Sequence, residues 1–109
     1  MRTSRRHPSH PVPHPAEGLR EDVLPALKIS KAAFAKALGV SRQTLYDLLA
    51  ERQGITAEMA IRLEKVIGGS AEFWLARQAS YDLWKARKSS MKAGLKKLRA
   101  ATSLREAAE

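Results

Sequence analysis

The 109-residue chain contains no cysteine. Disulfide bonds and thiolate metal sites are therefore excluded, and a cysteine-free chain suits the reducing cytoplasm, where we expect the protein to reside. No stretch approaches the roughly 20 consecutive apolar residues that a membrane-spanning helix needs. No apolar signal-peptide core follows the basic N-terminus. We therefore expect a soluble protein without a membrane partner.

Side chains that carry chemistry are also scarce. The predicted folded region has no glycine-rich phosphate loop after a strand and no helix with paired carboxylates facing a pocket. The three histidines, His7, His10 and His14, alternate with prolines in a spacing that fits no fixed metal-binding geometry. We expect them to be solvated residues of an extended arm. The sequence thus predicts no enzymatic activity, no metal and no cofactor.

The net charge of +9 favours anionic partners, but the excess charge lies at the two ends of the chain. Residues 1–15 carry three arginines and no acidic residue, and residues 85–109 carry eight basic and two acidic residues. Residues 16–84 carry nine of each sign. Basic tails add non-specific phosphate affinity to almost any core, so charge alone does not identify a nucleic-acid site in the middle.

The length allows one compact domain with tails. Closely spaced prolines predict an extended or disordered basic arm over residues 1–15. We assign the folded domain to residues 16–84. Residues 85–109 then form a basic helical extension or tail, which either reaches flanking phosphates or stays solvated.

Helical periodicity and capping residues predict an all-α fold with five helices. The first helix runs from Ala16 to about Leu27, and Pro25 should end or bend it. No segment shows the alternation of a strand. The other four helices are expected to begin after the capping residues Ser30, Ser41, Thr56 and Ser70. The second helix covers residues 31–38, and the third begins at residue 42. The fourth ends at residue 67, and the fifth runs from residue 71 toward Gly94.

The segment KAAFAKALGVSRQTLYDLL, residues 31–49, has the spacing of a helix-turn-helix. In that motif two short helices cross steeply through a tight turn, and the second enters the major groove of DNA. The positions that fit are a small residue at Ala35, a turn glycine at Gly39, a core plug at Val40, and inner-face anchors at Leu45 and Leu48.

The exposed face of the second helix distinguishes this motif from two helices that merely pack together. The helix opens with Ser41, Arg42, Gln43 and Thr44, whose side chains can bond phosphates and base edges from a helix N-terminus. A helix without a partner more often begins with acidic residues, which suit its dipole. The pattern therefore predicts sequence-specific DNA binding.

Each polar position has an expected role. Gln43 and Thr44 are the first candidates for base-edge contacts, followed by Arg42 and Tyr46. For Tyr46 a partly buried structural position is an equal alternative. We interpret Ser41 as a helix cap that also reaches a phosphate.

Three further basic residues are candidate phosphate contacts. Lys31 and Lys36 lie on the first helix of the motif, and Arg52 follows the second. The alternative for each is a solvated surface charge.

The motif resembles the Xre-like, phage-repressor-type DNA-binding family, and a wider run resembles HigA-type antitoxins of bacterial toxin–antitoxin modules. The resemblance covers about Pro13 to Trp84. Its landmarks are HPAEGLREDVL (14–24), ALGVSRQTLYDLL (37–49) and the run from residue 52 to residue 84, above all SAEFWL followed by YDLW.

Together with the five predicted helices, the resemblance implies a repressor-like domain with a central helix-turn-helix. The extended C-terminal helix is expected from the residues alone, because no strong helix breaker occurs before Gly94. It further implies an antitoxin that neutralises a HigB-like ribonuclease toxin and, as a dimer, represses its own operon at a palindromic operator. A stand-alone regulator without a toxin partner would carry the same motifs. A third alternative is a basic protein whose tails bind RNA or membranes non-specifically.

The last predicted helix holds four of the six aromatic residues. We expect Phe73 to close the monomer core. Trp74, Tyr81 and Trp84 fall close to one stripe that continues toward Leu98, which is more apolar surface than a small core covers. The stripe therefore predicts a homodimer interface, and a dimer would place two recognition helices about 34 Å apart, one turn of DNA.

Overall fold

The computed structural model describes residues 11–94, and this range is helical apart from short connections. The expectations for His7, His10 and the chain from residue 95 onward lie outside the described residues. The elements are α1 (Pro15–Gly18), the π-helical turn η1 (Leu19–Val23), α2 (Leu24–Leu27), α3 (Lys31–Leu38), α4 (Arg42–Leu49), α5 (Ala57–Ile67) and α6 (Ala71–Ala93). Because α1, η1 and α2 run on without a break, they form one helix, and the predicted all-α, five-helix fold is confirmed.

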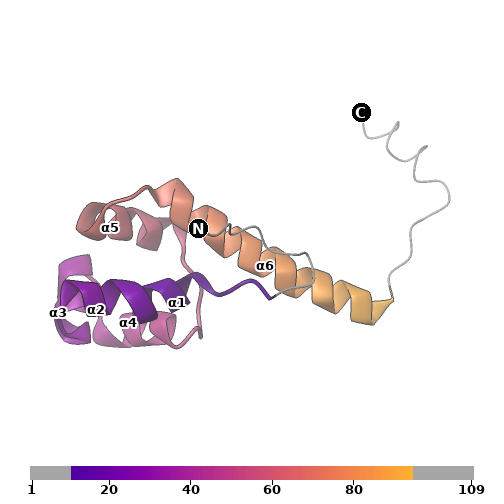
Figure 1. Ribbon diagram of the computed structural model, residues 1–109, viewed down its shortest axis with the longest axis horizontal. Coiled ribbons are helices and arrows are strands. Elements are labelled where there is room, and N and C mark those ends of the chain that lie inside the picture. Colours follow the sequence, from indigo (N-terminus) through magenta and orange to yellow (C-terminus); the bar gives the residue numbers. More distant parts are fainter. Residues whose placement is uncertain (1–10, 95–109) are drawn as a thin grey trace.

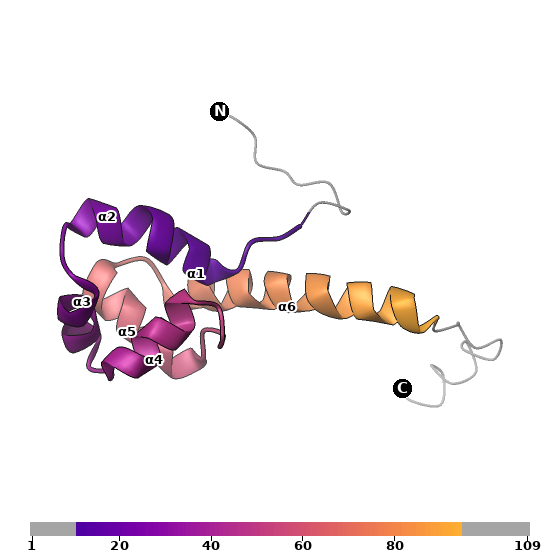
Figure 2. The ribbon, with the colours of Figure 1, turned by 90° about the horizontal axis from the view of Figure 1, so that it is seen from below.

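The shorter helices gather at one end of the molecule, and α6 extends away from them (Figure 1). The beginning of α6 packs against α5 and α1, whereas its second half projects beyond the other helices (Figure 2). Within residues 11–94, no helix combines the length and the apolar content that crossing a bilayer requires.

Hydroxyl side chains begin four of the helices where the sequence predicts them. Each hydroxyl oxygen accepts a hydrogen bond from the backbone N–H three residues further on, at 3.0–3.2 Å. These bonds satisfy backbone donors that a helix N-terminus leaves without partners. The capping residues are Ser30 for α3, Ser41 for α4, Thr56 for α5 and Ser70 for α6.

Pro25 does not end the first helix. Proline lacks a backbone N–H, and its ring clashes with the carbonyl four residues earlier in a regular α-helix. The preceding turn is widened instead, and the Leu24 N–H donates to the Leu19 carbonyl in π-helical register. The helix then continues to Leu27 and ends at Lys28, whose φ of 57° is left-handed.

His14 is not the solvated arm residue that the sequence predicts. Its side chain is only 4% exposed, and its Nδ1 accepts a hydrogen bond from the Ala16 N–H at 3.0 Å. The ring also stands edge-on against Tyr81, with centroids 4.8 Å apart. Burial lowers the pKa of His14, which favours the neutral imidazole that can accept this bond. The histidine therefore begins α1 and joins it to α6.

The core reverses the expectations for the two adjacent aromatic residues. Trp74 is 7% exposed and belongs to the core of the monomer, whereas Phe73 is 50% exposed. Successive residues of a helix point about 100° apart, so only one of the two can face α5 and the first helix. The prediction of Trp74 as a dimer contact is therefore wrong, as is the prediction of Phe73 as a core residue.

Candidate nucleic-acid interface

The turn between α3 and α4 favours glycine through its backbone conformation and brings Arg62 close to it. Gly39 has a φ of 75°, a conformation that other residues rarely adopt. A Cβ at this position would also lie 2.8 Å from Nη1 of Arg62, a residue of α5. That nitrogen donates to the carbonyl of Leu38 at 2.8 Å, and Nη2 of Arg62 donates to Glu58 at 2.9 Å. Arg62 thus holds the end of α3 against α5, a role that the sequence analysis missed.

The inner face of α4 lies in the core as predicted. Leu45 and Leu48 are fully buried, and Ala35 of α3 is 1% exposed. Val40 is partly buried against the same cluster. These four residues pack in the core at the positions that the motif predicts. The opposite face of α4 therefore lies at the surface.

The outer face of α4 exposes most of the predicted contact residues. Arg42 and Gln43 are exposed in the first turn, and Tyr46 is 39% exposed, so it is partly buried and still partly accessible, and both expectations for it stand. Thr44 is half-buried, and its Oγ1 accepts a hydrogen bond from the Ser41 hydroxyl at 2.9 Å. Ser41 is a cap as predicted, and the same bond orients Thr44.

The basic candidates differ in their surroundings. The Nζ of Lys31 lies 5.9 Å from the ring centroid of Tyr46, so α3 contributes a cation beside the outer face of α4. Lys36 is exposed on α3, and its side chain forms no hydrogen bond or ion pair with another residue between 11 and 94. Arg52 pairs with Asp47 instead of standing free, with Nη2 2.9 Å from Oδ1.

Asp47 is a residue of this face to which the sequence analysis gave no role. Its Oδ1 accepts hydrogen bonds from Nε2 of Gln43 at 2.8 Å and from Nε of Arg52 at 3.0 Å. The bond from Arg52, followed by the one from Gln43, lowers the pKa of Asp47. An ionised Asp47 fixes which way the Gln43 amide faces, and leaves Gln43 with one N–H and one oxygen for another partner. The one available signal was the i, i+4 spacing of Gln43 and Asp47.

The end of α4 is held by a residue from the first helix. Nη1 of Arg20 donates to the carbonyl of Leu49 at 2.7 Å and to Glu51 at 3.3 Å. Glu51 has a left-handed φ of 63°, and the N–H of Arg52 reaches back to the carbonyl of Asp47 at 2.8 Å. This is a Schellman end with a glutamate where glycine is usual. Arg20 is distant in sequence from α4, so no local pattern indicates its role.

The loop after α4 is held by α6. The buried Gln78 accepts a hydrogen bond from the Ile55 N–H at 2.8 Å and donates to Asp82 at 3.0 Å. A Cβ on Gly54 would lie 2.8 Å from the Gln78 side chain, so only glycine permits this close approach. The chain is therefore held after α4 by the first helix and α6, and before α4 by Arg62 of α5.

The fold agrees with a known family. A family model described as helix-turn-helix matches residues 19–74, which is more than half of the chain. The chain belongs to this helix-turn-helix family.

Named relatives of the family include antitoxins. The chain is 45% identical to virulence-associated protein I of Dichelobacter nodosus over 73 residues, covering 67% of this chain and 68% of the relative. It is 36% identical to antitoxin HigA-1 of Vibrio cholerae over 87 residues, covering 80% and 78%. The chain is also similar to the solved structure of Pseudomonas aeruginosa antitoxin HigA with the higBA promoter. The two sequences are 39% identical, the TM-score is 0.69, and the match covers 80% of this chain and 98% of that one. The expected resemblance to HigA-type antitoxins is confirmed.

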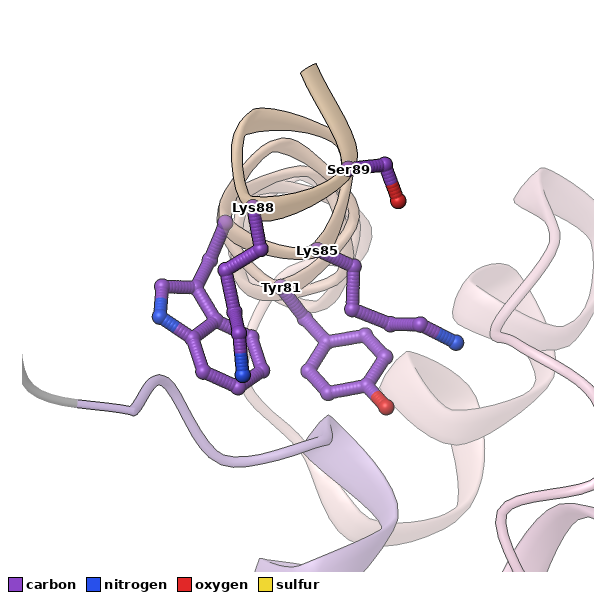
Figure 3. A pocket seen from close by; sticks show the side chains of 5 residues that line it. Tyr81, Lys85, Lys88 and Ser89 are labelled. Carbon is purple, nitrogen blue, oxygen red and sulfur yellow. The ribbon is translucent and has the colours of Figure 1, made fainter. Parts of the chain in front are cut away.

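Aromatic residues of α6 form a second surface, outside the helix-turn-helix. Tyr81 and Trp84 are half-buried, with ring centroids 6.1 Å apart, and line a shallow pocket of about 320 Å³. Figure 3 shows Tyr81, Lys85 and Lys88 around this pocket. Each lysine lies against one ring: Lys85 Nζ is 5.6 Å from the Tyr81 centroid, and Lys88 Nζ is 4.8 Å from that of Trp84. Met91, further along α6, is 81% exposed.

Proposed function

We propose that the protein is a sequence-specific DNA-binding protein that inserts α4 into the major groove. The observation that carries this proposal is the exposed first turn of α4, where Arg42 and Gln43 point away from a fully buried inner face. These side chains match the donor and acceptor patterns of base edges in that groove. The similar structure of Pseudomonas aeruginosa antitoxin HigA with the higBA promoter supports DNA binding.

The roles within the interface follow from the surroundings of each side chain. Gln43, held by Asp47, presents its remaining amide hydrogen and its oxygen to an adenine, and Arg42 reaches a guanine. Thr44 and Tyr46 contact neighbouring bases. The phosphate contacts are proposed for Ser41, Lys31, Lys36 and Arg52.

We further propose that the protein is an antitoxin which represses its own operon as a dimer and neutralises a HigB-like ribonuclease toxin. Similarity to antitoxin HigA-1 supports this assignment. Tyr81 and Trp84, continued by the exposed Met91, are the proposed dimer contacts on α6. Trp74 does not belong to this surface, because the monomer core buries it.

DNA binding is tested by footprinting the full-length protein on its own promoter, beside a shuffled duplex of equal length. We expect protection of a palindrome whose half-sites lie one helical turn, about 34 Å, apart. Equal affinity for the shuffled duplex would contradict sequence-specific binding.

The dimer is tested by sedimentation of the protein at micromolar concentration. The wild type should sediment as a dimer and the variant Trp84→Ser as a monomer. A monomeric wild type would contradict the proposed dimer.

The toxin partner is tested separately, by co-expression with the product of the gene immediately upstream. Co-purification of the two proteins, with loss of ribonuclease activity, is the expected result. A protein that protects its operator but retains no neighbouring gene product would be a stand-alone regulator.

A further inference from the structure

A cleft of about 380 Å³ lies where η1, the connection between α5 and α6, and the first turns of α6 meet. No residue that lines the cleft belongs to α3 or α4. The cleft is therefore separate from the proposed DNA interface, and a ligand in it need not compete with DNA for side chains.

Two buried hydrogen-bond donors at this cleft have no acceptor. The indole Nε1 of Trp74, a residue only 7% exposed, and Nε of Arg77 are both buried without a partner among residues 11–94. Buried donors are nearly always paired in proteins, because an unpaired donor has lost its water without a replacement. Both groups can only donate, so the missing partner is an acceptor.

The charge of Arg77 is also unpaired within the described residues. Its guanidinium forms none of the ion pairs there, and it lies over the ring of Phe73 at 5.5 Å from the centroid. A guanidinium placed against an aromatic ring in this way keeps its edge available for a planar anion. A carboxylate supplies the planar, acceptor-only group that both donors need.

Apart from Asp22, the remaining surface of the cleft is apolar and open. Phe73 is half exposed at its edge, and a Cβ added to Gly68 or Gly69 would meet no atom within 4 Å. Asp22 stands on the η1 side and disfavours a ligand with several negative charges. The cleft thus suits one carboxylate with an adjacent apolar group, and does not suit a nucleic-acid backbone.

We propose that this cleft binds a segment of a partner protein that presents a carboxylate beside an apolar side chain. Because both nitrogens are covered in the unliganded protein, the side chains over them move aside when the carboxylate accepts hydrogen bonds from Trp74 and Arg77. The apolar side chain packs on Phe73. This site does not depend on DNA binding, because none of the residues involved lies on the helix-turn-helix surface.

The two tryptophans of the chain allow a direct test. In the full-length protein labelled with ¹⁵N at the indole nitrogens, the peptide acetyl-leucyl-aspartyl amide is titrated, with acetyl-leucyl-asparaginyl amide as the uncharged match. We expect a saturable downfield shift of the Trp74 indole signal with the aspartyl peptide alone, and no change at Trp84. Equal responses to both peptides, a response at Trp84 alone, or no response would overturn the proposal.

Variants identify the groups that hold the carboxylate. Arg77→Gln should weaken peptide binding about tenfold or more, because it removes the charge. If that variant fails to fold, Asp22→Asn tests the same site with the opposite sign, since removal of the like charge should tighten binding two- to threefold, roughly. Glu72→Gln, an exposed residue that does not line the cleft, is the matched control and should bind as the wild type does.

Two further probes separate this ligand from other anions. Sodium acetate should shift the Trp74 signal only at concentrations about tenfold higher or more, because it lacks the apolar group. An equal response to acetate would reduce the site to a simple anion site and overturn the peptide assignment. A stronger response to inorganic phosphate or to a DNA duplex would also overturn it.

Discussion

The inner and outer faces of α4 differ in what holds their side chains in place. On the inner face, Leu45 and Leu48 are fully buried in the core formed by several helices. On the outer face, Gln43 is exposed and is oriented by a hydrogen bond to the side chain of Asp47. A change on the inner face therefore disturbs the whole domain, whereas a change on the outer face alters what the surface binds.

The largest expected effect is on the inner face. Leu48→Ala should lower the free energy of unfolding by about 2–5 kcal/mol, because it leaves a cavity in the core. Urea denaturation measures this effect. The outer-face variant Gln43→Ala is the matched control and should stay within about 0.5 kcal/mol of the wild type. Similar losses in the two variants would contradict the difference between the faces.

The outer face should show its effect in DNA binding. Gln43→Ala should weaken operator binding by about 1–3 kcal/mol and leave binding to random DNA nearly unchanged, since only base readout is lost. Lys36→Ala should weaken both alike and reduce the salt dependence. Titration of each variant on both duplexes at several salt concentrations makes the comparison, and equal losses on both duplexes for Gln43→Ala would refute its base-reading role.

The loop after α4 should show an intermediate loss of stability. Gln78→Leu removes the acceptor of the buried Ile55 N–H and should cost about 1–3 kcal/mol in unfolding free energy. Asp82→Asn is its control, because it keeps an oxygen that can accept from Gln78 Nε2. A fully stable Gln78→Leu protein would show that α6 does not hold this loop.

The smallest expected effect is a pH dependence at His14. Its folded-state pKa is lowered, chiefly by burial, so the unfolded chain binds a proton more readily than the folded protein does. The stability that His14 contributes is complete above its ordinary pKa of 6.5 and is lost as the pH falls through the lower folded value. His14→Asn retains a capping side chain that does not titrate. Denaturation between pH 8 and 5 should therefore depend less on pH in this variant, and parallel curves would exclude His14 as the cause.

The parts of the fold that could be predicted from sequence are those that depend on neighbouring residues. A serine or threonine cap bonds an N–H three residues away, and Gly39 adopts a left-handed φ by itself, so helix starts and the turn of the motif follow from short-range patterns. The exposed polar positions of α4 follow equally from its period. The same period predicted that Leu45 and Leu48 face inward.

Those short-range patterns do not predict contacts between residues that are distant in the sequence. Arg20 reaches the carbonyl of Leu49 across 29 positions, and Gln78 reaches Ile55 across 23. His14 lies in a segment with the composition of an arm, yet it is a buried cap whose ring packs against Tyr81 of α6, a residue distant in the sequence.

The sequence by itself determined the number of helices and the face of α4 that carries polar side chains, because capping, glycine conformation and helical periodicity act over a few residues. Only the tertiary structure decided the rotation of α6, which buries Trp74 and exposes Phe73, and with it the two unpaired donors of the cleft. The sequence alone does not determine which of two adjacent aromatic residues is buried in the core. The packing of α5 and the first helix against α6 selects one of them.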